Sequence, residues 1–259
     1  MIKRIISAVI LIPIAVYLIL FADILYMKIA IIAVGGLSYK EWIEMDSQKI
    51  NIIRFIYFAL YFLFAISIVF FTQMALYCLF FIFIVHMIVN FTKLEKEYFM
   101  FNSFMFSGII YVSLYFFAIF LSNMENGRII LMMLLVSIWT GDSFAYFCGK
   151  KIGKHKLSKF ISPKKTYEGA VCGVVFGSLS AVVFAYFLHN FNLIFAFYIG
   201  FIANITGIFG DLAESVVKRV FNKKDSSNLI PGHGGMLDRL DSASFAVFFV
   251  YLFMLWKVL

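Results

Sequence analysis

The sequence predicts an all-α membrane protein with about nine helices that cross the bilayer. Hydrophobic residues make up 63% of the 259 residues and charged residues 14%, whereas soluble domains are about half apolar and a quarter charged. The apolar residues also occur in runs close to the roughly 20 residues that a spanning helix needs. Because a water-soluble core could not hold this much apolar surface, we expect residues 1–259 to form a single membrane domain.

Apolar runs separated by short polar breaks define the expected spans in order. In the first half of the chain they are 4–22, 24–41, 52–71, 73–91 and 104–121. In the second half they are 129–147, 168–188, 193–213 and 241–258. The first run follows Lys3 and Arg4 as in a signal peptide, but it is long and no small-residue cleavage site follows it, so we expect a retained span.

The basic residues indicate how the chain is oriented. Lysine and arginine concentrate in the cytoplasmic loops of membrane proteins. If the N-terminus is cytoplasmic, nineteen of the 22 basic residues fall inside: Lys3, Arg4, Lys40, Lys49, Arg54, Lys93, Lys96, Lys150, Lys151, Lys154, Lys156, Lys159, Lys164, Lys165, Lys218, Arg219, Lys223, Lys224 and Arg239. The other three, Lys28, Arg128 and Lys257, fall outside. We therefore expect a cytoplasmic N-terminus and an external C-terminus, and we do not interpret the net charge of +8 as a sign of nucleic-acid binding.

The two halves of the chain differ in their polar content. Residues 1–135 contain uninterrupted spans and only an isolated His86, which we interpret as a hydrogen-bonded packing residue, so we expect them to be mainly scaffold. From 136 onward carboxylates lie in or beside the spans, where each costs about 2.5 to 3.5 kcal/mol unless it has a partner or a watery cavity. We therefore expect 136–259 to be the catalytic half, with cytoplasmic loops at 148–167 and 214–240.

The three cysteines, Cys78, Cys148 and Cys172, lack the spacing of metal ligands. We interpret them as packing residues and expect neither a disulfide framework nor a zinc site.

The first polar constellation begins with Asp142 and Tyr146 and continues through seven lysines between Lys150 and Lys165. Glycines between these lysines would let the backbone approach an anionic phosphate or a pyrophosphate leaving group. The alternative is a polybasic stretch attracted to anionic lipid headgroups, and charge alone does not separate the two. The segment 162–166 before a helix start at Glu168 favours a shaped loop with a capping hydroxyl.

Two further constellations follow. Asp211, Glu214, Ser215 and Lys218 share one helical face at the end of the eighth expected span, with Arg219 beside them. A glycine-rich turn at 231–235 then leads to Asp238, Arg239 and Asp241 at the start of the last span. The alternative is that these aspartates only cap the last helix and pair with Arg239. Three such sites on one side of the membrane favour a functional role.

The acidic residues favour Mg²⁺ as the metal. This ion prefers one or two carboxylates together with waters and substrate phosphates, and the sequence contains no competing cluster of histidine and cysteine. In nucleotidyl transfer, the metal and nearby lysines would neutralise the phosphates.

The stretch from Ser215 to Asp241 resembles the signature of phosphatidate cytidylyltransferases, also called CDP-diglyceride synthases. It reads Ser215-Val-Val-Lys218-Arg219, then Lys224-Asp225-Ser-Ser, then Ile230-Pro-Gly-His233-Gly234-Gly235-Met-x-Asp238-Arg239-Leu-Asp241. The segments Asp142-x-x-Ala145-Tyr146 and Ser162-Pro-Lys164-Lys165-Thr166 are similar to the family as well, whereas the first 130 residues are similar only in hydropathy.

The resemblance implies that CTP and phosphatidic acid condense to CDP-diacylglycerol and pyrophosphate in phospholipid biosynthesis. It also implies dependence on Mg²⁺, a K⁺ ion beside it, a homodimer and a location in the cell membrane, here a bacterial inner membrane. Asp211 and Asp238 would ligate the metal centre.

These observations give a residue-level hypothesis. We expect Asp211, Asp238 and Asp241 to hold metal and triphosphate, and Lys218, Arg219 and Arg239 to bind phosphates of CTP or the lipid. Lys164 and Lys165 would bind the phosphates of the nucleotide donor. The other predicted substrate-binding residues are Asp142, Tyr146, Ser162, Thr166, His233, Gly234 and Gly235.

Three other functions are alternatives to cytidylyl transfer. A CTP-dependent lipid kinase, such as a polyprenol kinase, would transfer the γ-phosphate instead of the cytidylyl group. A CDP-alcohol phosphatidyltransferase would carry D-x-x-D-G-x-x-A-R, which this sequence lacks. A transporter would place its carboxylates near the bilayer midplane between internal repeats, and no such repeat is found.

Overall fold

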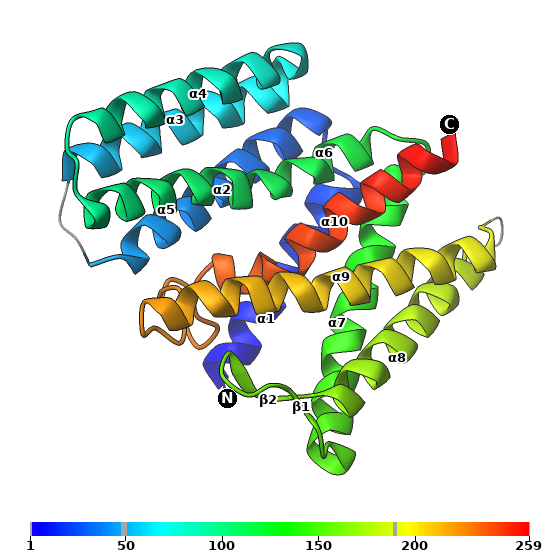
Figure 1. The fold of residues 1–259 in the computed structure, drawn as a ribbon. Helices are drawn as coiled ribbons and strands as arrows, with labels where there is room; N and C mark the ends of the chain where they lie inside the picture. The colour runs from blue at the N-terminus through cyan, green and yellow to red at the C-terminus, as the bar shows by residue number, and fades with distance from the viewer. Residues whose placement is uncertain (1, 48–50, 189–190, 259) are drawn as a thin grey trace.

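The computed structural model describes residues 2–47, 51–188 and 191–258, so Lys49, one of the residues expected in the cytoplasm, lies outside it. Within these ranges the chain is almost entirely helical (Figure 1), which confirms the all-α prediction. The first half contains α1 (Ile2–Leu20), α2 (Ile24–Met45), α3 (Asn51–Phe70), η1 (Thr72–Met74), α4 (Ala75–Phe91), α5 (Lys96–Ser113), η2 (Leu114–Phe116) and α6 (Phe117–Ser122). The second half contains α7 (Gly127–Ile152), β1 (Lys156–Ser158), β2 (Ser162–Thr166), α8 (Tyr167–Tyr186), α9 (Leu193–Val220) and α10 (Leu237–Val258).

Seven helices in the described ranges are long and apolar enough to cross a membrane, which makes this a polytopic membrane protein. They are Ile52–Phe70, Thr72–Phe91, Lys96–Ser122, Gly127–Ile152, Tyr167–Tyr186, Leu193–Val220 and Leu237–Trp256. The first two expected spans correspond to α1 and α2. Only the part Val9–Leu20 of α1 qualifies as a shorter apolar helix, and α2 carries Lys28, Lys40, Glu41 and Glu44. Crossing by α1 and α2 therefore stays a prediction.

The buried side chains form two cores. The first joins α2, α3 and α5 through large aromatic residues such as Tyr39, Tyr61 and Phe101. The second joins α1, α7, α8, α9 and α10, and Figure 1 shows α7, α8 and α9 crossing at one side of the molecule. Leu237 and Leu240, in the first turn of α10, pack in the first core, whereas residues from Ala243 onward pack in the second. The start of α10 therefore connects the two halves of the chain.

Small residues allow α7, α8 and α9 to approach closely. Asn204 of α9 donates hydrogen bonds to Ser137 Oγ at 2.7 Å and to the Gly200 carbonyl at 2.8 Å. A Cβ atom on Gly173 of α8 would lie 3.0 Å from the carbonyl oxygen of Gly141 in α7. Small residues and polar side chains of this kind hold helices together in lipid, where apolar burial alone gives little attraction. This packing fixes α7 and α9, which carry Asp142, Tyr146, Asp211, Lys218 and Arg219 of the predicted site.

His86 has the structural role expected from the sequence. It is buried, its Nδ1 lies 2.6 Å from the hydroxyl of Tyr57, and Asn90 lies within 3.3 Å of its Nε2. Asn102 donates a further hydrogen bond to Asn90 at 3.0 Å. The network joins α3, α4 and α5 and satisfies polar groups that would otherwise be costly inside a membrane domain.

Two expected loops are shorter than predicted. α7 continues to Ile152 and β1 and β2 form an antiparallel hairpin, so most of 148–167 has regular structure. α9 continues to Val220 and α10 begins at Leu237, so the second connection is 221–236 instead of 214–240. The hydrophilic residues at 211–218 predict the end of a span, yet they stay helical because they share a helical face and have partners there.

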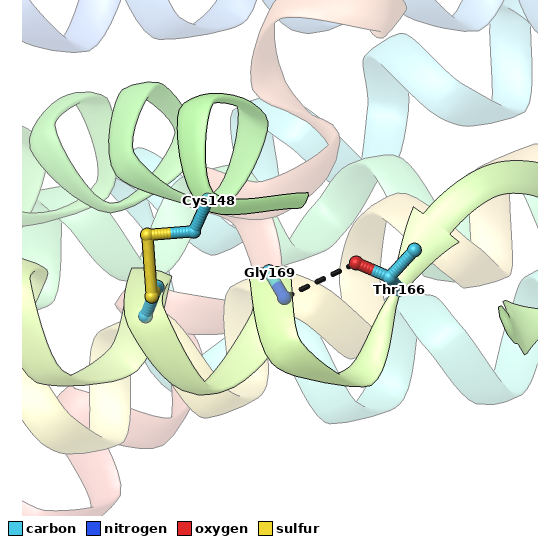
Figure 2. Close-up of a disulfide and its surroundings, with 4 residues drawn as sticks. Cys148, Thr166 and Gly169 are labelled. Carbon is cyan, nitrogen blue, oxygen red and sulfur yellow. Dashed lines mark hydrogen bonds between the residues drawn. A yellow bond between two sulfur atoms is a disulfide. The ribbon is translucent and has the colours of Figure 1, made fainter. Parts of the chain in front are cut away.

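The interpretation of all three cysteines as packing residues is wrong for two of them. Cys148 of α7 and Cys172 of α8 form a disulfide with Cα atoms 6.4 Å apart (Figure 2), and Cys78 is the free cysteine. The separation of 24 residues hid this pair, because the hairpin returns α8 alongside α7 and brings both cysteines to the same level.

The disulfide predicts a simple labelling result. Unfolded, unreduced protein should react with one equivalent of a thiol reagent, at Cys78, and three equivalents should react after reduction. Peptide mass mapping identifies the labelled cysteines. Three reactive thiols before reduction, in protein purified without reductant, would contradict the pairing.

Candidate active site

The hairpin presents the predicted phosphate-binding lysines in a fixed arrangement. Its register pairs Lys156 with Thr166 and Ser158 with Ser162. Thr166 Oγ1 accepts a hydrogen bond from the Gly169 N–H at 3.1 Å and so caps α8 (Figure 2), as the sequence predicted. His155 contacts the Glu168 carboxylate with its ring at 2.6 Å and donates to it from the backbone N–H at 3.2 Å. The hairpin is thus tied at its base to the first turn of α8.

A cavity of about 580 Å³ lies between the hairpin, α7 and α9. This volume falls in the range of small-molecule sites, about 300 to 1,000 Å³. Its charged and polar lining includes Asp142, Tyr146, Lys150, Lys156, Lys164, Lys165, Thr166, Asp211 and Ser242. The structure therefore brings part of the first constellation together with Asp211 of the second.

Both carboxylate oxygens of Asp211 have a partner within the protein. One oxygen accepts a hydrogen bond and ion pair from Lys165. The other accepts a hydrogen bond from Ser215 Oγ at 3.2 Å, one helical turn away. Because the Lys165 and Asp211 side chains are about 30% and 27% exposed, the pair remains open to the cavity.

A buried charge cluster lies next to the cavity. Lys218 Nζ lies 2.6 Å from Asp238 Oδ1 and 3.2 Å from Glu214 Oε2, and all three side chains are at most 8% exposed. Charges removed from water are costly unless each is paired. The helical spacing of Glu214 and Lys218 predicted their proximity, whereas the pairing of Lys218 with Asp238 depends on how α9 and α10 pack.

The glycine-rich turn at 231–235 positions Asp238 in this charge cluster. Gly232 and Gly234 have φ angles of 80° and 82°, which L-residues with side chains adopt rarely. Asp238 Oδ2 accepts hydrogen bonds at 2.8 Å from the N–H groups of Gly235 and Ser226 and at 2.9 Å from Ser226 Oγ. Both oxygens of Asp238 are therefore occupied by protein donors.

Glu41 of α2 is the main residue that sequence reasoning missed. It lies in the half expected to be scaffold and is 4% exposed. Its carboxylate accepts hydrogen bonds from Ser226, Ser227, and the N–H groups of Met236 and Leu237. In the sequence, an acidic residue at the end of the apolar run 24–41 is the only local sign of this role, and such a residue equally well marks the end of a span.

The carboxylates around the cavity suit a cation. Asp142 interacts electrostatically with Asp241 and Asp211, and Asp241 is in contact with Glu214. Among the described residues, neither oxygen of the buried Glu214 accepts a hydrogen bond in good geometry, although Oε2 forms the ion pair with Lys218 at 3.2 Å. Within the described ranges, no three His, Cys, Asp or Glu side chains form a ready-made metal site. Mg²⁺ does not require one, because it binds through one or two carboxylates plus substrate phosphates. Asp211 lines the cavity and interacts electrostatically with Asp241, so these two carboxylates stay the predicted metal ligands.

The other predicted residues lie around this centre. Arg219 donates from Nε to the Ile161 carbonyl at 3.1 Å, so it supports the hairpin. His233 Nδ1 lies 2.6 Å from Ser7 Oγ of α1. Arg239 is exposed and interacts electrostatically with Asp142. The roles proposed for these residues in substrate binding remain predictions.

Comparison with known protein families shows where this chain belongs. A model of the cytidylyltransferase family matches residues 2–256. The chain belongs to the cytidylyltransferase family. This confirms the family resemblance found in the signature stretch, and it extends the relationship to the first half, where the sequence alone showed only similar hydropathy.

Several curated relatives of this cytidylyltransferase-family chain carry the name phosphatidate cytidylyltransferase. The Bacillus subtilis protein is 38% identical over 174 residues, which are 65% of each chain. The Haemophilus influenzae protein is 41% identical over 134 residues, 49% of this chain and 46% of that one. The Staphylococcus haemolyticus protein is 37% identical over 164 residues, 62% of this chain and 63% of that one. The chain thus matches between about half and two thirds of the length of these relatives.

Proposed function

We propose that this protein condenses CTP with phosphatidic acid to give CDP-diacylglycerol and pyrophosphate. The observation that carries the proposal is the cavity in which lysines of the hairpin face Asp142 and Asp211 within a membrane domain. A triphosphate and a lipid phosphate both require positive charge, and a membrane protein gives the lipid access. The names of the relatives support the same pair of substrates.

The reaction would proceed by attack of the lipid phosphate on the α-phosphorus of CTP. An oxygen of phosphatidic acid forms the new bond to this phosphorus, and the bond between the α-phosphorus and the bridging oxygen to the β-phosphorus breaks. Pyrophosphate leaves with the electron pair of that bond. Because the nucleophile is already an anion, no proton has to be removed and no general base is needed.

The protein's own groups would orient and neutralise the phosphates. Lys164 and Lys165 line the cavity and would bind the triphosphate, and Asp211 and Asp241 would hold Mg²⁺. When bound there, Mg²⁺ would supply positive charge that neutralises the phosphates. Asp238 also stays a predicted ligand, although it would first have to release Lys218 or Ser226. K⁺ beside Mg²⁺ is part of the same proposal.

Product stoichiometry tests this function. Purified protein in detergent should release one pyrophosphate for each CTP consumed, and only when phosphatidic acid and Mg²⁺ are both present. Chelation of the metal should stop the release. Formation of CDP with a newly phosphorylated lipid would instead identify a lipid kinase.

We also propose that the hairpin faces the cytoplasm of a bacterial inner membrane and that the protein is a homodimer. The distribution of lysine and arginine supports this orientation. A Lys159→Cys variant, changed at an exposed hairpin residue, should react with a membrane-impermeant thiol reagent in inside-out vesicles and not in right-side-out vesicles. The opposite labelling pattern would refute the cytoplasmic orientation of the hairpin. Light scattering in detergent should give the mass of two chains, and the mass of one chain would refute the homodimer.

A further inference from the structure

Glu41 is a buried carboxylate with no assigned role and four hydrogen-bond donors. Oε1 accepts from Ser227 Oγ at 2.6 Å and from the Met236 N–H at 2.9 Å. Oε2 accepts from Ser226 Oγ at 3.1 Å and from the Leu237 N–H at 2.8 Å. All four donors lie in the connection 221–236 or at the first residue of α10, far along the chain from α2.

Two of these donors belong to the start of a helix. The first N–H groups of a helix have no partner inside it, and the partial positive charge there favours an anion. Met236 and Leu237 supply such groups at the start of α10. Glu41 therefore caps α10 from a different helix and fixes where its first turn, with Asp238, begins.

The other two donors connect Glu41 with Asp238. Ser226 Oγ lies 3.1 Å from Glu41 and 2.9 Å from Asp238, and its N–H donates to Asp238 at 2.8 Å. Asp238 in turn holds Lys218 at 2.6 Å. A continuous chain of contacts thus runs from Glu41 through Ser226 to the buried charge cluster.

The surroundings of Glu41 are shaped to hold it in place. A Cβ atom on Gly235 would lie 2.7 Å from the Glu41 carboxyl carbon and would also overlap Ser226 Oγ. On α2 itself, Tyr39 and Trp42 donate hydrogen bonds to carbonyls of α5 at 2.9 and 3.0 Å. The hydrogen bonds of Tyr39 and Trp42 thus fix α2 against α5, and the Glu41 carboxylate packs against Gly235, where a larger residue would overlap it.

We propose that Glu41 is a positioning residue for the reaction, which rests on the function proposed above. It does not line the cavity and acts through the connection 221–236 and the start of α10. Its loss leaves the cavity lysines intact but lets Asp238, Arg239 and Asp241 move relative to them.

Kinetics of Glu41→Gln and Glu41→Ala test the proposal. Groups that orient catalytic ligands without touching substrate contribute about 10- to 100-fold to activity, so kcat of Glu41→Ala should fall by this factor while KM for CTP changes little. Glutamine has the volume of glutamate but only one acceptor oxygen, so Glu41→Gln should fall between Glu41→Ala and the wild type. If Glu41 only filled space, the Glu41→Gln variant would have the kcat of the wild type.

Glu44→Gln is the matched control. Glu44 lies three residues further along α2, and its side chain is 54% exposed in a loose pair with Lys40 at 3.9 Å. It should show wild-type kcat. Equal losses in Glu44→Gln and Glu41→Gln would mean that any charge removed from this end of α2 matters, which would overturn the proposal.

Hydrogen exchange tests the same inference without any assay of activity. In Glu41→Gln, amides of 226–237 should exchange about tenfold faster, the effect of losing a hydrogen bond to a charged group, while α4 is unchanged. Unchanged exchange at 226–237 would refute the positioning role. If wild-type protein makes no CDP-lipid, the proposed function fails, and hydrogen exchange still decides whether Glu41 holds this connection.

Discussion

Replacing Asp211 with asparagine is expected to abolish cytidylyl transfer while the protein stays inserted and folded. Asp211 lines the cavity, pairs with Lys165 and lies near the carboxylates of Asp142 and Asp241. Asparagine keeps the shape of the side chain but removes the charge that would hold a cation and orient Lys165. Removing one group that stabilises transition-state charge costs about 10²- to 10³-fold in kcat, so we expect at least this loss.

The Asp211→Asn experiment needs a measure of folding beside the rate. Size-exclusion profile and thermal unfolding in detergent should match those of the wild type. Glu125→Gln, at an exposed acidic residue before α7, is the control that should retain full activity. If the Asp211→Asn variant were well folded and turned over at the wild-type rate, the catalytic role assigned to Asp211 would be refuted.

Replacing Lys218 with methionine is expected to cause the largest loss of stability. Lys218 is the ammonium between Glu214 and Asp238, and all three side chains are at most 8% exposed. Removing one partner of a buried charge cluster leaves uncompensated charge and typically costs about 3 to 5 kcal/mol. The free energy of unfolding in mixed detergent micelles should fall by this amount, and transfer activity should be lost.

A second substitution distinguishes charge from packing in the Lys218 cluster. Adding Asp238→Asn to Lys218→Met removes one of the two carboxylate charges that Lys218 neutralised, so part of the lost stability should return. Lys224→Met, at an exposed lysine of the connection 221–236, should change stability by less than about 1 kcal/mol. A similarly small effect of Lys218→Met would show that the cluster is not a stabilising centre.

The helices and their order were predictable because lipid imposes a strong pattern on the sequence. Backbone polar groups must be satisfied inside each segment in a bilayer, so apolar runs of sufficient length become helices. The limits of α9 were less predictable, since Asp211, Glu214 and Lys218 are hydrophilic yet remain helical. Their partners lie on the same face or on α10, and this compensation appears only after packing.

The chemistry of the site was predictable where it depends on local sequence. The lysines of the hairpin, the Thr166 cap and the shared face of Asp211 and Ser215 all follow from residue type and spacing. The role of Glu41 depends on donors 185 to 196 residues away, which no local pattern contains. The Cys148 and Cys172 pair likewise depends on the return of α8 along α7.

Transfer of label from CTP tests the central claim most directly. Purified protein is incubated with phosphatidic acid, Mg²⁺ and CTP labelled at either the α- or the γ-phosphorus, and lipids are then extracted. We expect label in the lipid fraction from α-labelled CTP only, with the γ-label recovered in pyrophosphate. Label in lipid from γ-labelled CTP only, with CDP as the other product, would contradict it.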